Sequence, residues 1–272
     1  METFFSFLER RVDDCSSLLC IGLDPHISDL PEPTAEAALA FCRTLVKQTA
    51  RYAAAFKPNA AFFEVFGPEG WSALRKVVEA VQEESDRIGS MIPVILDAKR
   101  GDIASTAEAY AQSAFGKLGV HAITLSPYVG KDSIEPFLVN QEKGVFLLCK
   151  TSNPGSADLQ DMPLANGMMV HEYVAHLAQE WNTKNNIGLV VGVTHPEALQ
   201  RVRAVAPGLW FLAPGVGAQG GDLETALKVG LRKDGKGLLV NVSRSIARAE
   251  RPDIAAAELR DEILHLRQQV SH

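Results

Sequence analysis

Short apolar runs alternate with helical patterns along the whole sequence, and this alternation is what most limits the fold. The apolar runs cover residues 17–24, 53–59, 91–99, 121–128, 144–152, 187–194, 209–217 and 237–245. The helical patterns cover residues 34–52, 69–87, 105–119, 132–144, 167–185, 195–206, 221–235 and 252–269. Strict strand–helix alternation predicts a parallel sheet. Eight such units in a chain of 272 residues match the size of a (β/α)₈ barrel.

An open, doubly wound sheet is the alternative arrangement for alternating strands and helices, but such sheets usually contain fewer strands. No Pro/Gly/Ser-rich linker, block of like charges or low-complexity tract divides the chain. The sequence therefore predicts an α/β protein with a single (β/α)₈ (TIM) barrel domain over residues 1–272. A short amphipathic helix over about residues 3–15 is expected to precede the first strand.

The composition limits the partners and the compartment. A net charge of −6 gives no basic field that would attract nucleic acid or an anionic membrane surface. No apolar stretch reaches the length of a membrane span, and acidic residues flank the short apolar run at the N-terminus, unlike a signal peptide. The four cysteines show no CxxC spacing and lie in apolar segments, as reduced thiols do. We expect a cytoplasmic protein.

Charged residues gather where the third apolar run ends, in ILDAKRGDIAST at residues 95–106. Side chains alternate along a strand, so Asp97 and Lys99 share one face while the apolar face turns to the helices. Both side chains should then point inward at the mouth of the barrel, where barrel enzymes carry their active sites. The spacing of Ser105–Glu108 predicts a capping box that starts the next helix. Asp102 would lie on the loop before it.

Other strands also end in polar groups: Asp24 follows the first run, Lys57 lies in the second and Arg244 lies in the eighth. A single inward Lys–Asp pair could be a salt bridge that braces the barrel. Several lysines and aspartates at one rim are harder to explain in this way, because removing so many charges from water is costly. They indicate a catalytic array.

A glycine-rich segment, APGVGAQGGD at residues 213–222, follows the seventh run. Gly215, Gly217 and Gly220 match G-x-G-x-x-G, but a dinucleotide fingerprint belongs in a first βαβ unit, so we reject that interpretation. The loops after strands seven and eight of a barrel commonly bind phosphate, and Arg244 could add a bidentate contact. The alternative is that these glycines only form a tight turn. The seven histidines share no metal-ligand spacing, and none is assigned to a metal.

The segment from Asp97 to Ile103, with Thr106 beyond it, resembles the D-x-K-x-x-D-I-x-x-T signature of the orotidine 5′-phosphate decarboxylase family. The segment KRGD, residues 99–102, resembles the longer, second type of that family. Five further segments occur in the family's order at successive strand ends: GLDPH, FKPNAAFFEVFG, KTSNPGS, PGVGAQGGD and NVSRSI. D-x-K-x-x-D alone is only moderately specific, because related sugar-phosphate enzymes share it. With the other five segments it is specific.

The resemblance implies a homodimeric enzyme without cofactor or metal that converts orotidine 5′-phosphate to UMP and CO₂ in de novo pyrimidine synthesis. It implies that Lys99 donates the proton to C6 of the pyrimidine. Lys57, Asp97 and Asp102 would form the charge network around Lys99, with Asp102 supplied by the partner subunit.

The resemblance also implies the residues that bind the rest of the nucleotide. Asp24 would bind the ribose hydroxyls, Thr106 would reach the ribose across the dimer interface, and Ile103 would contact the substrate beside Asp102. Ser152 would bind the pyrimidine amide, although Thr151 and Asn153 could do similar work. The phosphate would be held by Gln219 and Arg244, with Gly217 in the same loop.

The charges suit this chemistry independently of the resemblance. Loss of CO₂ from C6 leaves a carbanion with no adjacent carbonyl, so the site itself must stabilise the charge. A fixed ammonium can do so in a water-poor pocket, and flanking carboxylates keep it protonated. Whether Asp97 also crowds the substrate carboxylate stays open. Residues 152–167 are long enough for a lid over the substrate.

Three other functions compete with this one. A related barrel aldolase or 3-keto-acid sugar-phosphate decarboxylase would use a divalent metal held by the acids. A Schiff-base aldolase would need Lys57 or Lys99 as a free amine, which nearby acids disfavour. A catalytically dead nucleotide-binding protein would have little reason to keep a full set of costly buried charges.

Overall fold

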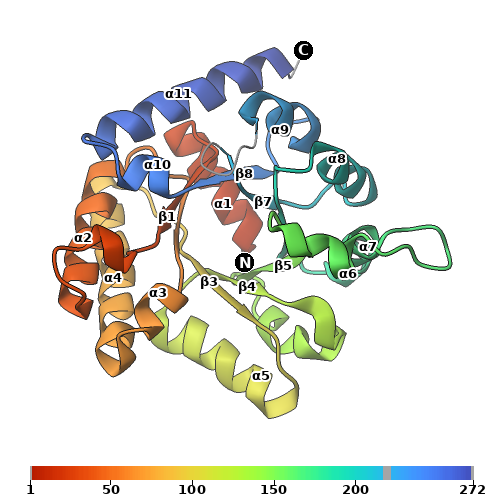
Figure 1. Cartoon of the computed structure of the whole chain (residues 1–272), viewed down its shortest axis with the longest axis horizontal. Helices are drawn as coiled ribbons and strands as arrows, with labels where there is room; N and C mark the ends of the chain where they lie inside the picture. Colours follow the sequence, from red (N-terminus) through yellow and green to blue (C-terminus); the bar gives the residue numbers. More distant parts are fainter. Residues whose placement is uncertain (1, 217–221, 271–272) are drawn as a thin grey trace.

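The computed structural model describes residues 2–216 and 222–270, and it contains one eight-stranded sheet of parallel strands in the order β2-β1-β8-β7-β6-β5-β4-β3. The strands are β1 Leu19–Leu23, β2 Ala55–Pro58, β3 Ile95–Arg100, β4 Ala122–Leu125, β5 Gly144–Lys150, β6 Ile187–Val191, β7 Phe211–Pro214 and β8 Leu238–Val242. Isolated parallel bridges pair Phe56 with Val94 and Asn59 with Asp97, joining β2 to β3. They close the sheet into the predicted barrel, with the helices outside it (Figure 1).

The helices that follow the strands form the outer layer (Figure 1). The α-helices are α1 Phe4–Cys15, α2 Ala35–Thr49, α3 Ala61–Glu64, α4 Gly67–Ile88, α5 Ala104–Ala111, α6 Ala157–Gln160, α7 Val170–Trp181, α8 Pro196–Val205, α9 Leu223–Gly230, α10 Arg244–Ala247 and α11 Pro252–Val270. A π-helix over Gln112–Leu118 continues α5. The 3₁₀ segments are Ile27–Asp29, Pro127–Val129, Lys131–Ser133, Glu135–Leu138 and Pro154–Ser156. None of the helices described is long and apolar enough to cross a membrane.

Two local predictions are wrong. The helix after β3 begins at Ala104, two residues earlier than the capping box requires, so Ser105 and Glu108 lie within its first turns. Its N-cap is Ile103, whose side chain makes no cap hydrogen bond. The helix predicted over residues 132–144 is replaced by the 3₁₀ segments Lys131–Ser133 and Glu135–Leu138. Pro136 lacks an N–H donor and disfavours helical geometry at the residue before it, which explains the interruption.

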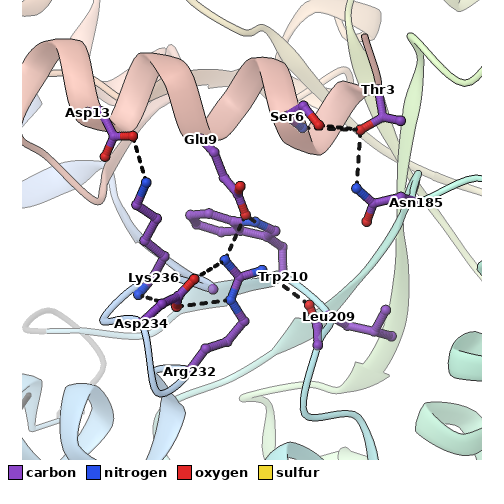
Figure 2. Close-up of polar contacts among 12 residues, drawn as sticks. Thr3, Ser6, Glu9, Asp13, Asn185, Leu209, Trp210, Arg232, Asp234 and Lys236 are labelled. Atoms are coloured by element: carbon purple, nitrogen blue, oxygen red, sulfur yellow. Dashed lines mark hydrogen bonds and ion pairs between the residues drawn. The ribbon is translucent and has the colours of Figure 1, made fainter. Parts of the chain in front are cut away.

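Helix α1 covers the N-terminal end of the barrel. Phe5 packs edge-on against Phe146 of β5 and stacks on Trp210, which immediately precedes β7. On its polar side, Glu9 Oε1 accepts hydrogen bonds from Trp210 Nε1 at 3.1 Å and Arg232 Nη2 at 2.7 Å (Figure 2). These contacts close one end of the barrel. The opposite end, where the strands finish, is the end of the barrel that α1 leaves open.

The four cysteines, Cys15, Cys20, Cys42 and Cys149, are free and buried. Burial raises the pKa of the Cys20 thiol to about 12. A thiol held in its neutral form is a poor nucleophile, so these side chains act as small apolar groups of the core.

Candidate active site

Three charged side chains meet at the C-terminal ends of β2 and β3: Lys57, Asp97 and Lys99, together called the charged triad. Lys57 Nζ donates to Asp97 Oδ2 at 2.9 Å, and Lys99 Nζ donates to Asp97 Oδ1 at 2.6 Å. The side chains of Lys57 and Asp97 are only 6% and 11% exposed, whereas that of Lys99 is 49% exposed. One carboxylate thus orients two ammonium groups, and of the three side chains only that of Lys99 is widely exposed.

Neighbouring charges keep Lys57 and Asp97 ionised despite their burial. Burial alone would lower the pKa of Lys57, but the carboxylates of Asp97 and Asp24 outweigh burial and raise it. Burial alone would raise the pKa of Asp97, but the Lys57 and Lys99 ammonium groups hold it well below its usual range. Lys57 is therefore protonated and Asp97 ionised at neutral pH, as a preorganised electrostatic site requires.

Lys99 is presented by a distortion of β3. Its backbone has a φ of +48°, a left-handed conformation that is uncommon for residues other than glycine, and the β3–β4 register shifts between Leu96 and Arg100. Asp97 and Lys99 do meet, as predicted, but the regular alternation on which that prediction was based is absent from this part of β3. A bulge aims Lys99 back toward Asp97, as bulges beside active sites often do.

Thr124 of β4 supports this distortion. Its Oγ1 accepts hydrogen bonds from the backbone N–H of Ala98 at 3.0 Å and of Lys99 at 2.9 Å. The same hydroxyl donates to Asp97 Oδ1 at 2.9 Å. A buried threonine therefore fixes both the backbone of Lys99 and the carboxylate that Lys99 contacts.

The charged triad lines a cavity of about 400 Å³ at the barrel mouth, called the active cavity. Asp24 and Ser152, both predicted as site residues, line the same cavity, together with Thr151 and Asn153. A second cavity of about 330 Å³ adjoins it and contains Arg244. Both are lined by Asp24, Pro214 and Asn241. The two cavities together have the acidic and basic side chains of the triad at one end and the Arg244 guanidinium at the other.

Some predicted residues lie elsewhere. Asp102, Ile103 and Thr106 do not line the cavities that the described part of the chain forms at the barrel mouth. Asp102 Oδ1 instead accepts from the backbone N–H of Ile103 at 2.8 Å, and Ile103 and Thr106 are exposed. Gly217 and Gln219 fall outside the described residues. Of the glycine-rich loop, Gly215 lines the cavity that contains Arg244.

Three site residues were not predicted from the sequence: Asn59, Thr124 and Asn241 all line the active cavity. Thr124 and Asn241 could have been found, because each is a polar residue within an otherwise apolar strand, AITL and LLVNV. Over residues 2–216 and 222–270, no three His, Cys, Asp or Glu side chains gather in a way that could hold a metal ion.

Comparisons with known proteins agree on one family. A family model described as Orotidine 5'-phosphate decarboxylase / HUMPS family matches residues 17–259. The orotidine 5'-phosphate decarboxylase of Roseiflexus castenholzii is 47% identical over 272 residues, which cover 98% of this chain and 97% of that protein.

Two solved structures from Leishmania donovani are also similar. The OMP decarboxylase is 53% identical, with a TM-score of 0.88, over 98% of this chain and 99% of that one. The UMP synthase is 54% identical, with a TM-score of 0.90, and this chain spans 57% of its length. With the charged triad at the mouth of a (β/α)₈ barrel, these matches show that the chain belongs to the orotidine 5′-phosphate decarboxylase family.

Proposed function

We propose that this protein decarboxylates orotidine 5′-phosphate to UMP and CO₂, with Lys99 as the proton donor and without a metal or cofactor. The observation that carries the proposal is Asp97, whose two carboxylate oxygens bind Lys57 at 2.9 Å and Lys99 at 2.6 Å on the wall of the active cavity. Such an array supplies a fixed positive charge where the reaction develops negative charge.

The reaction needs few steps. The bond between C6 and the carboxylate carbon breaks and CO₂ leaves. The electron pair of the broken bond remains on C6. The Lys99 ammonium stabilises that pair and transfers one proton from Nζ to C6, which gives UMP. Solvent then returns a proton to the Lys99 amine. Lys57 keeps Asp97 ionised, and Asp97 orients Lys99, so the charges need no rearrangement during the reaction.

Ribose binding is supported by two buried acceptors at the junction of the cavities. Asp24 Oδ1 and Asn241 Oδ1 are buried and have no hydrogen-bond partner among the described residues. Buried polar atoms without partners are costly, and a sugar hydroxyl donates the hydrogen bond that each lacks. We therefore assign Asp24 to the ribose. Ser152 is assigned to the pyrimidine amide, and Thr151 and Asn153 line the same wall.

The phosphate is assigned to the cavity that contains Arg244, the first residue of α10. Gly215 lines this cavity with a φ of +109°, a conformation that suits glycine. Gln219 and Gly217 stay predictions for the same phosphate. Separating the phosphate from the reacting carbon lets binding energy at one end hold the other in place.

Arg244→Ala is expected to raise the KM for orotidine 5′-phosphate and to lower kcat/KM about a hundredfold or more, roughly 3 kcal/mol, because the charged phosphate loses a bidentate partner. Steady-state kinetics measure both constants. Arg248→Ala is a matched control, since Arg248 lies near Arg244 but pairs with Asp29 at 3.0 Å. An unchanged KM in Arg244→Ala would show that the phosphate binds elsewhere.

Thr124→Val is expected to lower kcat at least about tenfold with a smaller change in KM. Valine has a similar shape but leaves the amides of Ala98 and Lys99 and the Asp97 carboxylate without their shared partner. Thr124→Ser keeps the hydroxyl and should retain most of the turnover. If the valine variant turns over at the wild-type rate, the bulge does not depend on Thr124.

The active enzyme is proposed to be a homodimer with shared sites. Asp102 and Thr106 lie on the segment that leaves β3, away from the cavities of their own chain. Exposed apolar side chains lie after β2, β3 and β4, at Val65, Ile103 and Tyr128, and Tyr128 is 81% exposed. A partner docked on this surface would place its own Asp102 and Thr106 at the neighbouring cavity. We also expect the enzyme to work in the cytoplasm, where free cysteines stay reduced.

The proposed function is tested by incubating the purified protein with orotidine 5′-phosphate and EDTA while the ultraviolet absorbance of the pyrimidine is followed. We expect complete conversion to UMP at a rate that the chelator does not change. Loss of turnover in EDTA, with recovery on adding a divalent metal, would favour the metal-dependent barrel enzymes. Tight UMP binding without any turnover would indicate a nucleotide-binding protein.

A further inference from the structure

Lys150, the last residue of β5, is a buried cation that the proposed reaction does not use. It is 1% exposed, and it lines a cavity of about 360 Å³ that shares no lining residue with the active cavity. Its Nζ donates to Ser156 Oγ at 2.9 Å and to Asp161 Oδ2 at 2.8 Å. A buried ammonium is costly unless it is paired, so this cation needs its two partners on the following loop.

Further hydrogen bonds tie the same loop to its own base. The backbone N–H of Thr151 donates to Gln160 Oε1 at 2.9 Å, and Gln160 Nε2 donates to Thr151 Oγ1 at 2.9 Å. The Gln160 carbonyl accepts from His171 Nδ1 at 2.8 Å, at the start of α7. Lys150, Ser156, Gln160, Asp161 and His171, here called the loop clamp, thus connect the loop to β5 and α7.

Ser152 lies between the loop clamp and Gly192, the residue that follows β6. The backbone N–H of Gly192 donates to the Lys150 carbonyl at 2.7 Å. A Cβ at Gly192 would lie 3.0 Å from Ser152 N and 3.1 Å from Ser152 Cβ, so Gly192 packs closely against Ser152. Thr151, the residue before Ser152, is held by its hydrogen bond to Gln160. The loop after Ser152 is held by the hydrogen bond between Lys150 and Ser156. Both sides of Ser152 therefore depend on the clamp.

We propose that Lys150 is a positioning residue for the decarboxylation: through the loop clamp it holds Ser152 against the pyrimidine end of the active cavity. This inference rests on the proposed function, because it assumes that Ser152 contacts the substrate. Lys150 does not line the active cavity, so its place in the fold is not that of a substrate contact. Its ammonium orders the loop from a cavity separate from the active cavity. Removal of the ammonium therefore loosens Ser152 while the barrel and the triad stay intact.

The test combines Lys150→Met with Ser152→Ala in a double-mutant cycle, with kcat/KM for orotidine 5′-phosphate as the readout. Lys150→Met alone is expected to lower kcat/KM at least about tenfold. In a Ser152→Ala background the same change should cost less than about threefold, because the group that Lys150 positions is already gone. Lys228→Met, which changes an exposed lysine of α9, is the control and should retain wild-type kinetics.

Asp161→Asn is the second variant, because Asp161 is 43% exposed on the loop and its change does not disturb the barrel core. It should show the same non-additivity with Ser152→Ala if Lys150→Met fails to fold. A purely structural role would instead give equal losses in both backgrounds, and that result would overturn the proposal. Wild-type kcat/KM in either Lys150→Met or Ser152→Ala would also overturn it.

Protection of the loop separates this inference from the proposed function. The Thr151 amide should exchange with solvent at least about tenfold faster in Lys150→Met than in the wild type, measured without any substrate. Failure of the wild type to convert orotidine 5′-phosphate would refute the proposed function and leave this exchange result standing. Unchanged exchange in Lys150→Met, with normal turnover by the wild type, would refute the clamp alone.

Discussion

Mixing Lys99→Ala and Asp102→Ala proteins, each nearly inactive alone, is expected to restore about one quarter of the wild-type activity after their subunits exchange. Random pairing makes about half of the dimers hybrid. If Asp102 serves the neighbouring site, each hybrid has one site with both changes and one site with neither. About one quarter of all sites are then intact.

The structure motivates this experiment through the position of Asp102. Its carboxylate accepts a hydrogen bond from the backbone N–H of Ile103. Asp102 does not line the cavity to which Lys99 of the same chain contributes. Activity is measured after dissociation and reassociation, with labelled subunits to show that exchange occurred. If Asp102 serves its own subunit, every site keeps one defect, and the exchanged mixture stays inactive.

Lys99→Ala is expected to lower kcat/KM for orotidine 5′-phosphate by about 10⁴-fold or more, roughly 5 kcal/mol, because one change removes both the proposed proton donor and the charge proposed to stabilise the carbanion. The barrel should fold, since Asp97 keeps its bonds to Lys57 and Thr124 and since Lys99 is half exposed. Steady-state kinetics, thermal unfolding and UMP binding by calorimetry are the measurements, with Lys228→Ala as the control.

This variant also separates catalysis from bracing of the barrel. If the Lys99–Asp97 pair mainly stabilised the fold, Lys99→Ala would lose cooperative unfolding and retain activity in whatever fraction stays folded. Lys57 offers the contrast, because it is more deeply buried than Lys99 and its removal leaves the Asp97 carboxylate, which is only 11% exposed, without its buried partner. Lys57→Ala should therefore reduce stability more than Lys99→Ala does.

The sequence was sufficient to predict the barrel because the same strand–helix pattern is repeated along the chain. Each strand–helix unit carries its own apolar run, and parallel strands place all their C-terminal ends on one rim. Lys57, Asp97 and Lys99 could therefore be expected to meet, and the structure confirms that they do. The family could be inferred as well, because its motifs fall at successive strand ends.

Features that depend on contacts between distant segments could not be predicted. The left-handed backbone of Lys99 is hydrogen-bonded to Thr124 in the neighbouring strand, whereas the pattern of β3 alone suggested regular alternation. Helix α5 starts at Ala104 after Ile103, whose side chain makes no cap hydrogen bond, so the spacing of capping residues could not locate its start. The ion pair of Lys150 could not be predicted, because its partner Asp161 lies on a loop whose course the sequence does not specify.

Chemical rescue of Lys99→Ala tests the proton-donor role most directly. The variant would be freed of metals with EDTA, saturated with orotidine 5′-phosphate, and followed for CO₂ release with and without ethylammonium, which can occupy the space of the missing side chain. A donor role predicts almost no release from the variant alone and a clear, saturable increase with the amine, while the wild type does not respond. Release by Lys99→Ala within about tenfold of the wild type, without any amine, would contradict it.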